Sequence, residues 1–318
     1  MRVVFFGTPA SAVPSLEALA NQGHDLVLVV TRPDRPSGRS ATPEPPPVKT
    51  AAVARGVPVV QPAKVRDAAF LEILRAARPE VLVVVAYGRI LPVDVFELPR
   101  YGAVNLHFSL LPLHRGAAPV AWALARGESE TGITTMRIGE RLDEGDLWLR
   151  RRIAIAPREH APSLLARLAS TGAALLTETL DGLAAGRLDP RPQDHDAATY
   201  APILTRADGA WDVAWRAREV EGRVRGFDPW PGVWASRSGR RIRIVEAEAL
   251  GGSSGEAPAG TVLGLEGGRA LVACAAGTVL AVDAVQPEGR RAIGAREAFN
   301  GRQLAPGDRL ESPAPPAS

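Results

Sequence analysis

Cysteine, lysine and long apolar runs are scarce or missing in this sequence, and each shortage narrows the classes of protein to consider. The single cysteine, Cys274, excludes an intrachain disulfide, and no group of cysteines and histidines has the spacing of metal ligands. We therefore expect no metal site and a reducing location, the cytoplasm. No apolar stretch approaches the roughly 20 residues that a membrane helix needs, so we expect no membrane association.

The first nine residues, MRVVFFGTP, contain a short apolar run that stops at Gly7. A secretion signal has a longer apolar region followed by a cleavage site. We therefore expect this run to form the first strand of the fold, and we do not expect export.

Lys49 and Lys64 are the only lysines among 38 Lys and Arg residues, and 35 Asp and Glu residues leave a formal net charge of +3. The guanidinium group of arginine suits phosphate and carboxylate partners. GC-rich coding, which favours Arg and Ala over Lys, accounts for the same bias. The charge therefore permits a nucleic-acid partner without requiring one.

The length of 318 residues predicts two domains. In the first part, short runs rich in Val, Leu and Phe alternate with helical patterns, which is the signature of βαβ units and a mostly parallel sheet. A long run at 163–185 has leucines near 3.6-residue spacing before Gly186, which predicts a helix. The expected strands are residues 3–6, 26–30, 58–60, 81–86 and 103–107, and the other expected helices are residues 15–21 and 67–77.

Residues 189–205 contain prolines and aspartates without an apolar period, so we expect a linker there. It would separate an α/β domain, residues 1–188, from a second domain, residues 206–310. We expect residues 311–318, which are mostly Pro, Ala and Ser, to be disordered. Gly-rich turns in the second domain separate short apolar segments, which predicts a small β-barrel or sandwich with strands near residues 241–245, 260–263, 270–274 and 279–285.

Gly7-Thr8-Pro9 follows the first expected strand, where a dinucleotide-binding fold would place the motif G-x-G-x-x-G. The second and third glycines are missing, and Pro9 removes a backbone N–H that a pyrophosphate would need. We therefore expect no NAD-dependent chemistry. Because ligands of open α/β sheets bind beyond the carboxyl ends of the strands, we still expect Gly7 to border the active crevice.

The stretch Val104–Pro112 runs off the end of another expected strand. Since strand side chains alternate between faces, Asn105 and His107 lie on the same face. Asp143 follows later in an acidic turn, and a carboxylate beside a histidine fixes its tautomer and favours its protonated form. Singly, a histidine at a strand end is often structural and an acidic turn is often only a turn. Jointly they predict an acid/base group with an oxyanion donor.

Six motifs lie in order in residues 1–200, and further matching residues lie in the second domain. The six motifs are Phe6-Gly7-Thr8-Pro9, Thr31-x-Pro33-Asp34-Arg35-Pro36-x-Gly38-Arg39, Ala86-Tyr87-Gly88-x-Ile90-Leu91-Pro92, Asn105-x-His107-x-Ser109-Leu110-Leu111-Pro112, Arg115-Gly116-x-x-Pro119 and Leu142-Asp143-x-Gly145-Asp146, and those of the second domain are Asp212, Arg223-x-Arg225-x-Phe227-x-Pro229-Trp230-Pro231-Gly232 and Gly307-Asp308. This set resembles the folate-dependent formyltransferases, most closely the branch that formylates methionyl initiator tRNA. The resemblance implies a Rossmann-like formyltransferase domain followed by an OB-like β-barrel that binds tRNA.

The resemblance implies that the protein moves a formyl group from 10-formyltetrahydrofolate to the α-amino group of methionine on initiator tRNA, with Asn105, His107 and Asp143 as catalytic residues. The Asn105 amide and a protonated His107 would stabilise the negative oxygen of the tetrahedral intermediate. Asp143 would orient and charge His107 and relay the proton to the departing folate nitrogen. The implied folate contacts are Ser109, Leu110, Leu111 and Pro112, with Tyr87, Gly88, Arg89, Ile90 and Leu91 around the pterin.

Residues 32–49 form a long Pro/Gly-rich insertion that resembles the family loop that enters the acceptor stem. Arg35 and Arg39 would there meet phosphates and base edges. In the second domain we expect Arg240 and Arg241 to contact phosphate and the preceding tryptophans to belong to the core. We expect a monomer that binds methionyl initiator tRNA and the folate co-substrate.

Two alternatives remain. A formyltransferase or formyl-folate hydrolase acting on a small substrate would use the same catalytic domain, but would lack the arginine loop and the barrel. A non-catalytic tRNA-binding module would have no reason to keep Asn105, His107 and Asp143 together.

Overall fold

A computed structural model describes residues 1–36 and 42–313 of the chain. The chain divides into two compact units. The first unit comprises Met1–Pro119, Glu130–Ala154 and Leu165–Pro202, and the second comprises Val120–Ser129, Ile155–Leu164 and Ile203–Ser318. Among the described residues, no helix combines the length and the apolar character that crossing a membrane requires.

Within the described residues, the first unit is built on a seven-stranded sheet with the order β5-β2-β1-β6-β7-β8-β9. Neighbouring strands from β5 to β7 pair in parallel, whereas β8 and β9 are antiparallel additions at one edge. This confirms the predicted Rossmann-like, mostly parallel sheet. The strands are β1 (Arg2–Gly7), β2 (Asp25–Val30), β5 (Val59–Val60), β6 (Val81–Val85), β7 (Ala103–His107), β8 (Glu130–Arg137) and β9 (Leu147–Ala154).

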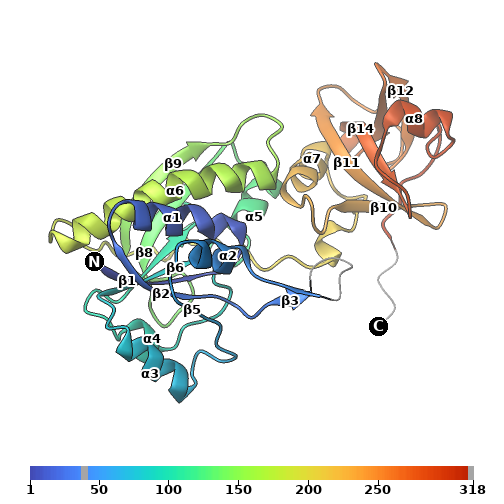
Figure 1. Cartoon of the computed structure of the whole chain (residues 1–318). Coiled ribbons are helices and arrows are strands. Elements are labelled where there is room, and N and C mark those ends of the chain that lie inside the picture. Colours follow the sequence, from blue (N-terminus) through green and yellow to red (C-terminus); the bar gives the residue numbers. More distant parts are fainter. Residues whose placement is uncertain (37–41, 314–318) are drawn as a thin grey trace. The chain divides into compact units, whose positions relative to one another are not determined.

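Helices cover both faces of this sheet, with α1 and α6 on one face and α3 and α4 on the other (Figure 1). Phe6 and Leu82 pack with the apolar side chains of α3 and α4 in one buried cluster. On the opposite face, Gly172 of α6 leaves room for the side chain of Leu106. The helices are α1 (Val13–Asn21), α2 (Pro47–Ala54), α3 (Ala68–Ala76), α4 (Val93–Phe96), α5 (Pro119–Ala125) and α6 (Ala161–Ala184), and a 3-10 turn η1 (Ala10–Ala12) precedes α1.

The expected strands and helices of the first unit agree with the observed ones to within two residues at each end. The insertion at residues 32–49 differs from the expected loop. It contains the short paired strands β3 (Arg35–Pro36) and β4 (Pro43–Glu44), and α2 begins at Pro47 because a proline is favourable in the first turn of a helix. Arg39 lies outside the described residues.

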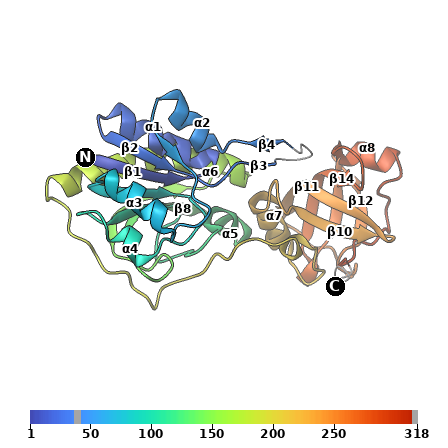
Figure 2. The same ribbon diagram turned by 60° about the horizontal axis from the view of Figure 1, so that its bottom comes forward.

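The second unit has a six-stranded sheet in its described part, with the order β10-β11-β14-β13-β12 and β15 paired to β14. All these pairs are antiparallel, which confirms the predicted class of sheet. Helix α7 lies beside β11 and helix α8 near β12 (Figures 1 and 2), and both contribute side chains to one buried core, Val220 and Val224 from α7 and Ala298 from α8. The elements are α7 (Ala217–Gly226), β10 (Val233–Arg237), β11 (Arg240–Leu250), β12 (Val262–Glu266), β13 (Arg269–Ala273), β14 (Val279–Pro287), β15 (Ile293–Gly294) and α8 (Ala295–Asn300), with 3-10 turns η2 (Ala207–Gly209) and η3 (Ala275–Gly277).

The segment 307–311 hydrogen-bonds to both edges of this sheet. Ser236 of β10 and Glu311 exchange two backbone hydrogen bonds, of 3.0 and 2.8 Å. At the other edge, the Val262 N–H donates to the Asp308 carbonyl (2.9 Å) and Leu310 donates to the Gly260 carbonyl (2.8 Å). The sheet is therefore closed into a ring. Glu311, which was expected to begin a disordered tail, pairs with Ser236. Residues 314–318 of the expected tail lie outside the described residues.

Two glycines of α7 explain how the short segment around α5 joins the second unit. A Cβ on Gly222 would lie 2.6 Å from the carbonyl oxygen of Leu124, and one on Gly226 would collide with the backbone of Ala121. Only glycine allows the two helix backbones to approach so closely. The ring of Trp122 then packs edge-on against Phe227, with centroids 5.4 Å apart.

Most of the expected linker at residues 189–205 is ordered against the first unit. Arg191 pairs with Leu147 at the end of β9, and Tyr200 pairs with Arg115. Gln193 between them is buried. These contacts are polar and irregular, so they leave no apolar period in the sequence, and the division between the units falls after Pro202.

Candidate active site

The carboxyl end of β7 positions Asn105 and His107. Both side chains point to the face of the sheet opposite Leu106, because successive strand residues alternate. Asn105 is half-buried beside Val84 and Met136 of the neighbouring strands, and His107 is buried. Asn105 and His107 therefore point to the same face of the sheet.

Both nitrogens of the His107 ring have a polar neighbour. Nε2 lies 2.9 Å from the carbonyl oxygen of His114, and Nδ1 lies 3.7 Å from Oδ2 of Asp143. A carbonyl can only accept, so Nε2 must carry a proton and donate it. Nδ1 is the nitrogen that faces the Asp143 carboxylate.

Asp143 is held by its own turn as well as by His107. Its backbone has a φ of +55°, in the left-handed region that few residues other than Gly, Asn and Asp occupy. The backbone N–H of Gly116 donates to Oδ2 (2.8 Å), and Gln193 Nε2 donates to the Asp143 carbonyl (2.8 Å). Gly145 completes the turn where a Cβ would collide with the carbonyl of Arg137. The carboxylate therefore contacts Gly116 and His107, and the backbone that carries it is held by Gln193.

A buried cation lies behind this turn. The side chain of Arg115 is only 2% exposed and lies 3.5 Å from the Glu144 carboxylate. It donates to Oε1 of Gln193 from Nε and Nη2, at 3.1 and 2.8 Å. Arg115 and Gly116 belong to one of the six motifs, but the sequence predicted no role for them. Gln193 was expected to lie in the linker. The available signal was the arginine itself, since a charged residue in an apolar turn requires a partner.

The expected folate residues after β7 form a loop that is tied to β8. The Ser109 hydroxyl donates to the Leu113 carbonyl (2.6 Å), and Thr134 donates to the Ser109 carbonyl (2.7 Å). Thr134 also accepts from the backbone N–H of Leu111 (3.2 Å). Ser109 and Leu111 are buried, whereas Leu110 and Pro112 are partly exposed. Only the latter two therefore offer side-chain surface to a ligand.

The residues expected around a pterin follow β6 and divide in the same way. Tyr87 and Leu91 are buried, with the Tyr87 ring edge-on to Phe6 at 5.3 Å, and burial raises the pKa of the Tyr87 hydroxyl. Arg89 donates to the carbonyls of Pro62 and Ala63. Two residues of this segment are exposed: the backbone of Gly88, which has a φ of +79°, and the side chain of Ile90, which is 75% exposed.

Three of the four expected tRNA contacts lie on exposed surfaces, and the fourth, Arg39, lies outside the described residues. Arg35 is exposed on β3 opposite Glu44, and Arg240 and Arg241 are exposed at the start of β11. The guanidinium of Arg241 lies 5.7 Å from the centre of the Trp234 ring. Of the expected core tryptophans, Trp211 is buried, Trp215 packs against the core, Trp234 is half-buried and Trp230 is 56% exposed.

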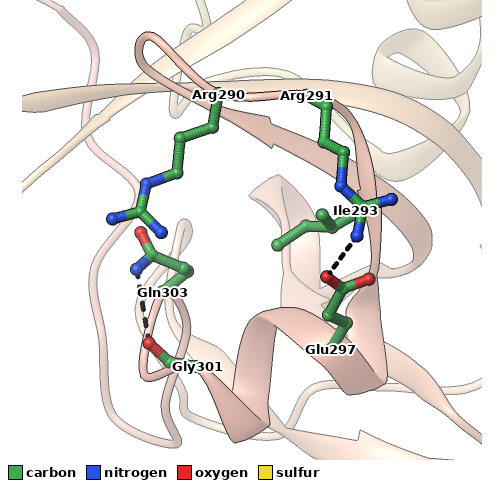
Figure 3. Close-up of a pocket in the computed structure, with 6 residues that line it drawn as sticks. All are labelled: Arg290, Arg291, Ile293, Glu297, Gly301 and Gln303. Atoms are coloured by element: carbon green, nitrogen blue, oxygen red, sulfur yellow. Dashed lines mark hydrogen bonds and ion pairs between the residues drawn. The ribbon is translucent and has the colours of Figure 1, made fainter.

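A pocket in the second unit adds two arginines that sequence reasoning did not single out (Figure 3). Arg290 and Gln303 lie on one side of it, and Arg291 and Glu297 form an ion pair of 3.0 Å on the other. The turn that carries Arg290 is joined to the start of β11 by the hydrogen bond from the Glu288 N–H to the Arg241 carbonyl (3.0 Å). The pocket is lined by Arg290, Arg291, Ile293, Glu297, Gly301 and Gln303.

Metal ligation has no candidate in the described residues. No group of three or more His, Cys, Asp or Glu side chains there could hold a metal ion. The polar groups around His107 and Asp143 suit proton handling and hydrogen-bond donation.

The chain matches the family described as formyl transferase over residues 1–180, and the formyl transferase C-terminal domain over residues 203–303. It is 48% identical to a methionyl-tRNA formyltransferase of Acidobacterium capsulatum over 311 residues, covering 98% of this chain and 99% of the relative. It is 47% identical to one of Myxococcus xanthus over 306 residues, covering 96% of each.

Solved structures share the fold. WlaRD, a sugar 3N-formyl transferase, has a TM-score of 0.67 at 14% identity, with coverage of 91% of this chain and 98% of WlaRD. The methionyl-tRNA formyltransferase of Clostridium thermocellum has a TM-score of 0.55 at 14% identity, with coverage of 79% and 94%. At such identities the likeness establishes the architecture, while the curated relatives establish the family. The chain belongs to the formyl transferase family and, within it, to the methionyl-tRNA formyltransferases.

Proposed function

We propose that this protein transfers the formyl group of 10-formyltetrahydrofolate to the α-amino group of methionine carried on initiator tRNA, producing N-formylmethionyl-tRNA. One observation carries the proposal. In a chain 48% identical over nearly its whole length to a methionyl-tRNA formyltransferase, the His107 ring lies 3.7 Å from the Asp143 carboxylate on the same strand face as Asn105.

The amine needs little activation. An α-amino group has a pKa of about 7.7–8.0, so a useful fraction is already uncharged near neutral pH. The barrier lies in the negative charge that develops on the formyl oxygen as the amine attacks. The Asn105 amide can donate a hydrogen bond to that oxygen, and so can a proton on His107, and one such donor typically lowers the barrier by about 2.7–4 kcal/mol.

Asp143 supports the histidine. With Nε2 committed to the His114 carbonyl, the proton that His107 offers or exchanges is the one at Nδ1, on the side of the Asp143 carboxylate. The carboxylate stabilises this proton and keeps the ring oriented. We assign the transfer of the amine proton toward the departing folate nitrogen to this pair of residues.

Surfaces near β6 and β7 fit a flat heteroaromatic co-substrate. Exposed Ile90 and partly exposed Leu110 offer apolar area, and Gly88 leaves its backbone uncovered. We therefore assign the pterin contacts to these residues, to Pro112 and to the backbone of Tyr87 and Leu91. 10-Formyltetrahydrofolate supplies the activated formyl carbon when bound. The solved relative WlaRD was determined in the presence of 5-N-formyl-THF, which is consistent with this assignment.

We assign the tRNA contacts of the second unit to the basic rim, defined as Arg240, Arg241, Arg290 and Arg291. Arginine side chains on an exposed surface neutralise phosphates and make affinity depend on salt. Arg291 is partly neutralised by Glu297, so Arg290 and the two arginines of β11 supply most of the free charge. In the first unit, Arg35 is a further candidate on the insertion that follows β2.

The decisive experiment supplies 10-formyltetrahydrofolate with one of three acceptors: methionyl initiator tRNA, methionyl elongator tRNA or glycinamide ribonucleotide. We expect rapid formylation of the initiator species alone. Equal labelling of both tRNAs would remove the specificity, and activity only with the small amine would favour the small-substrate alternative. We further propose a cytoplasmic monomer, which light scattering on the purified protein and fractionation of cells would check.

A further inference from the structure

The turn that carries Asp143 is closed by a single amide group. Nε2 of Gln193 donates to the carbonyls of Asp143 (2.8 Å) and Gly145 (2.7 Å). Both protons of this amide are therefore used on two carbonyls of one turn. Asp143 has a φ of +55°, in the left-handed region, and these two hydrogen bonds hold the 143–145 turn in that conformation.

The orientation of the Gln193 amide is fixed by Arg115. Two guanidinium nitrogens, Nε and Nη2, donate to Oε1 at 3.1 and 2.8 Å. Because Oε1 accepts from the arginine, Nε2 must face the turn, and a rotated amide would place its donors against a cation. Gln193 and Arg115 are only 5% and 2% exposed, so water cannot replace these partners.

Arg115 is itself anchored from several sides. It lies 3.5 Å from Oε1 of Glu144, the residue after Asp143, and it donates to Nδ1 of His195 (3.1 Å). Its backbone exchanges hydrogen bonds with Thr199 and Ala201. The next residue, Gly116, donates to the Asp143 carboxylate itself (2.8 Å). The contacts form a closed circuit from Arg115 through Gln193 to the turn and back.

We propose that Gln193 is a positioning residue that, oriented by Arg115, holds the Asp143 carboxylate against the Nδ1 side of His107. Gln193 does not touch the reacting groups. It acts through the backbone of the 143–145 turn, so its loss displaces the carboxylate without removing any group assigned to folate or tRNA. The expected loss of catalysis rests on the proposed function. The expected change at the His107 ring rests only on the contacts described above.

Gln193→Glu isolates the donor role. The new carboxylate keeps the contact with Arg115 but cannot donate to the two carbonyls, which it repels. Misplacement of a reacting group by about 1 Å typically costs about 100-fold in rate, so we expect kcat to fall by about 10- to 100-fold while KM for both substrates changes less than about threefold. Gln22→Glu, the same change on an exposed residue after α1, is the control and should retain full activity.

A second measurement needs no substrate. The chain has five histidines, and the ¹⁵N signals of the His107 ring can be assigned by their absence in His107→Ala. These signals report the proton on each ring nitrogen, so displacement of Asp143 should shift Nδ1 in Gln193→Glu and leave it unchanged in Gln22→Glu. Arg115→Lys, which keeps a charge near Glu144 but loses the two-pronged donation, should shift Nδ1 in the same direction by a smaller amount.

The outcomes separate the claims. A normal Nδ1 signal with normal kcat in Gln193→Glu would overturn the proposal. So would a lower melting temperature and lower kcat with an unchanged Nδ1 signal, because that pattern means a purely structural role. If the wild-type protein fails to formylate tRNA, the proposed function fails, but the shift of the Nδ1 signal still decides whether Gln193 positions Asp143.

Discussion

The surroundings of Asp143 and the basic rim of the second unit use arginine in opposite ways. Arg115 is almost fully buried, and its guanidinium group is held in a single orientation by Gln193 and Glu144. Arg240 and Arg241 are exposed at the start of β11. A buried cation therefore specifies a structure, and an exposed cluster supplies attraction. Loss of a single side chain should be costly in the first region and mild in the second.

The largest effect is expected at the centre of the first region. His107→Ala removes a donor to the developing charge, and kcat should fall by about 100- to 1,000-fold, with KM for the folate changed less than about threefold. Steady-state kinetics with methionyl initiator tRNA measures both. His160→Ala, a histidine of the second unit that pairs with Glu246, is the control with near-normal kcat. Near-normal turnover of the His107 variant would refute its role.

A matched pair of arginines on one carboxylate tests whether burial decides the cost. Arg115→Met should lower the free energy of unfolding by about 3 kcal/mol, because it leaves the half-enclosed Glu144 and the Gln193 oxygen without their buried partner. Arg141 binds the same Glu144 at 3.0 Å but its side chain is 76% exposed, so Arg141→Met should cost less than about 1 kcal/mol. Urea unfolding compares the two, and equal costs would contradict the comparison.

Exposed arginines should act additively. Arg240→Ala and Arg290→Ala should each raise KM for tRNA several-fold without changing kcat, and the salt dependence of binding should lose a slope of about 0.7–0.9 for each phosphate contact removed. Filter binding over a range of salt concentrations gives this slope. Arg75→Ala, which removes an exposed arginine of α3 in the first unit, is the control. Unchanged slopes in both variants would place the tRNA elsewhere.

The smallest effect is expected at a partly exposed ion pair of the first unit. The hydrogen bond from Lys49 to Asp34, with a second from Gln61, holds the pKa of the Asp34 carboxyl below its usual value. Because the pKa of Asp34 is lower in the folded protein than in the unfolded chain, its ion pair stabilises the fold at pH values above the unfolded-state pKa. This stabilisation is lost as the pH falls through the folded-state pKa. Asp34→Asn should lower the melting temperature by no more than about 2 °C near neutral pH, and the difference should vanish in acid. A difference in melting temperature that grows as the pH falls would contradict this role of Asp34.

The repeating pattern of side chains made much of the fold predictable. The apolar runs of β1, β6 and β7 and the leucine spacing of α6 depend only on local periodicity, and the expected ends lie within two residues of the observed ones. The closure of the second sheet could not be predicted, because residues 307–311 bind through backbone groups that leave no trace in the side chains.

The candidate site was predictable only in part for a related reason. The spacing of Asn105 and His107 on one strand fixes their common face, and the resemblance supplied Asp143. Gln193 could not be found, since its contacts are with backbone carbonyls and an arginine 78 residues earlier. Tyr87 and Leu91 were placed at a pocket, but their apolar surfaces pack into the core instead.

The pairing of residues 307–311 with both sheet edges has a consequence for how the chain tolerates shortening. A protein that ended at Ala305 would expose the free backbone groups of β10 and of the strand at Gly260–Val262 at once. Unpaired strand edges recruit other strands, so such a truncated chain should self-associate rather than simply lose stability. Fusions and affinity tags therefore belong after Ser312, where the ring is already complete.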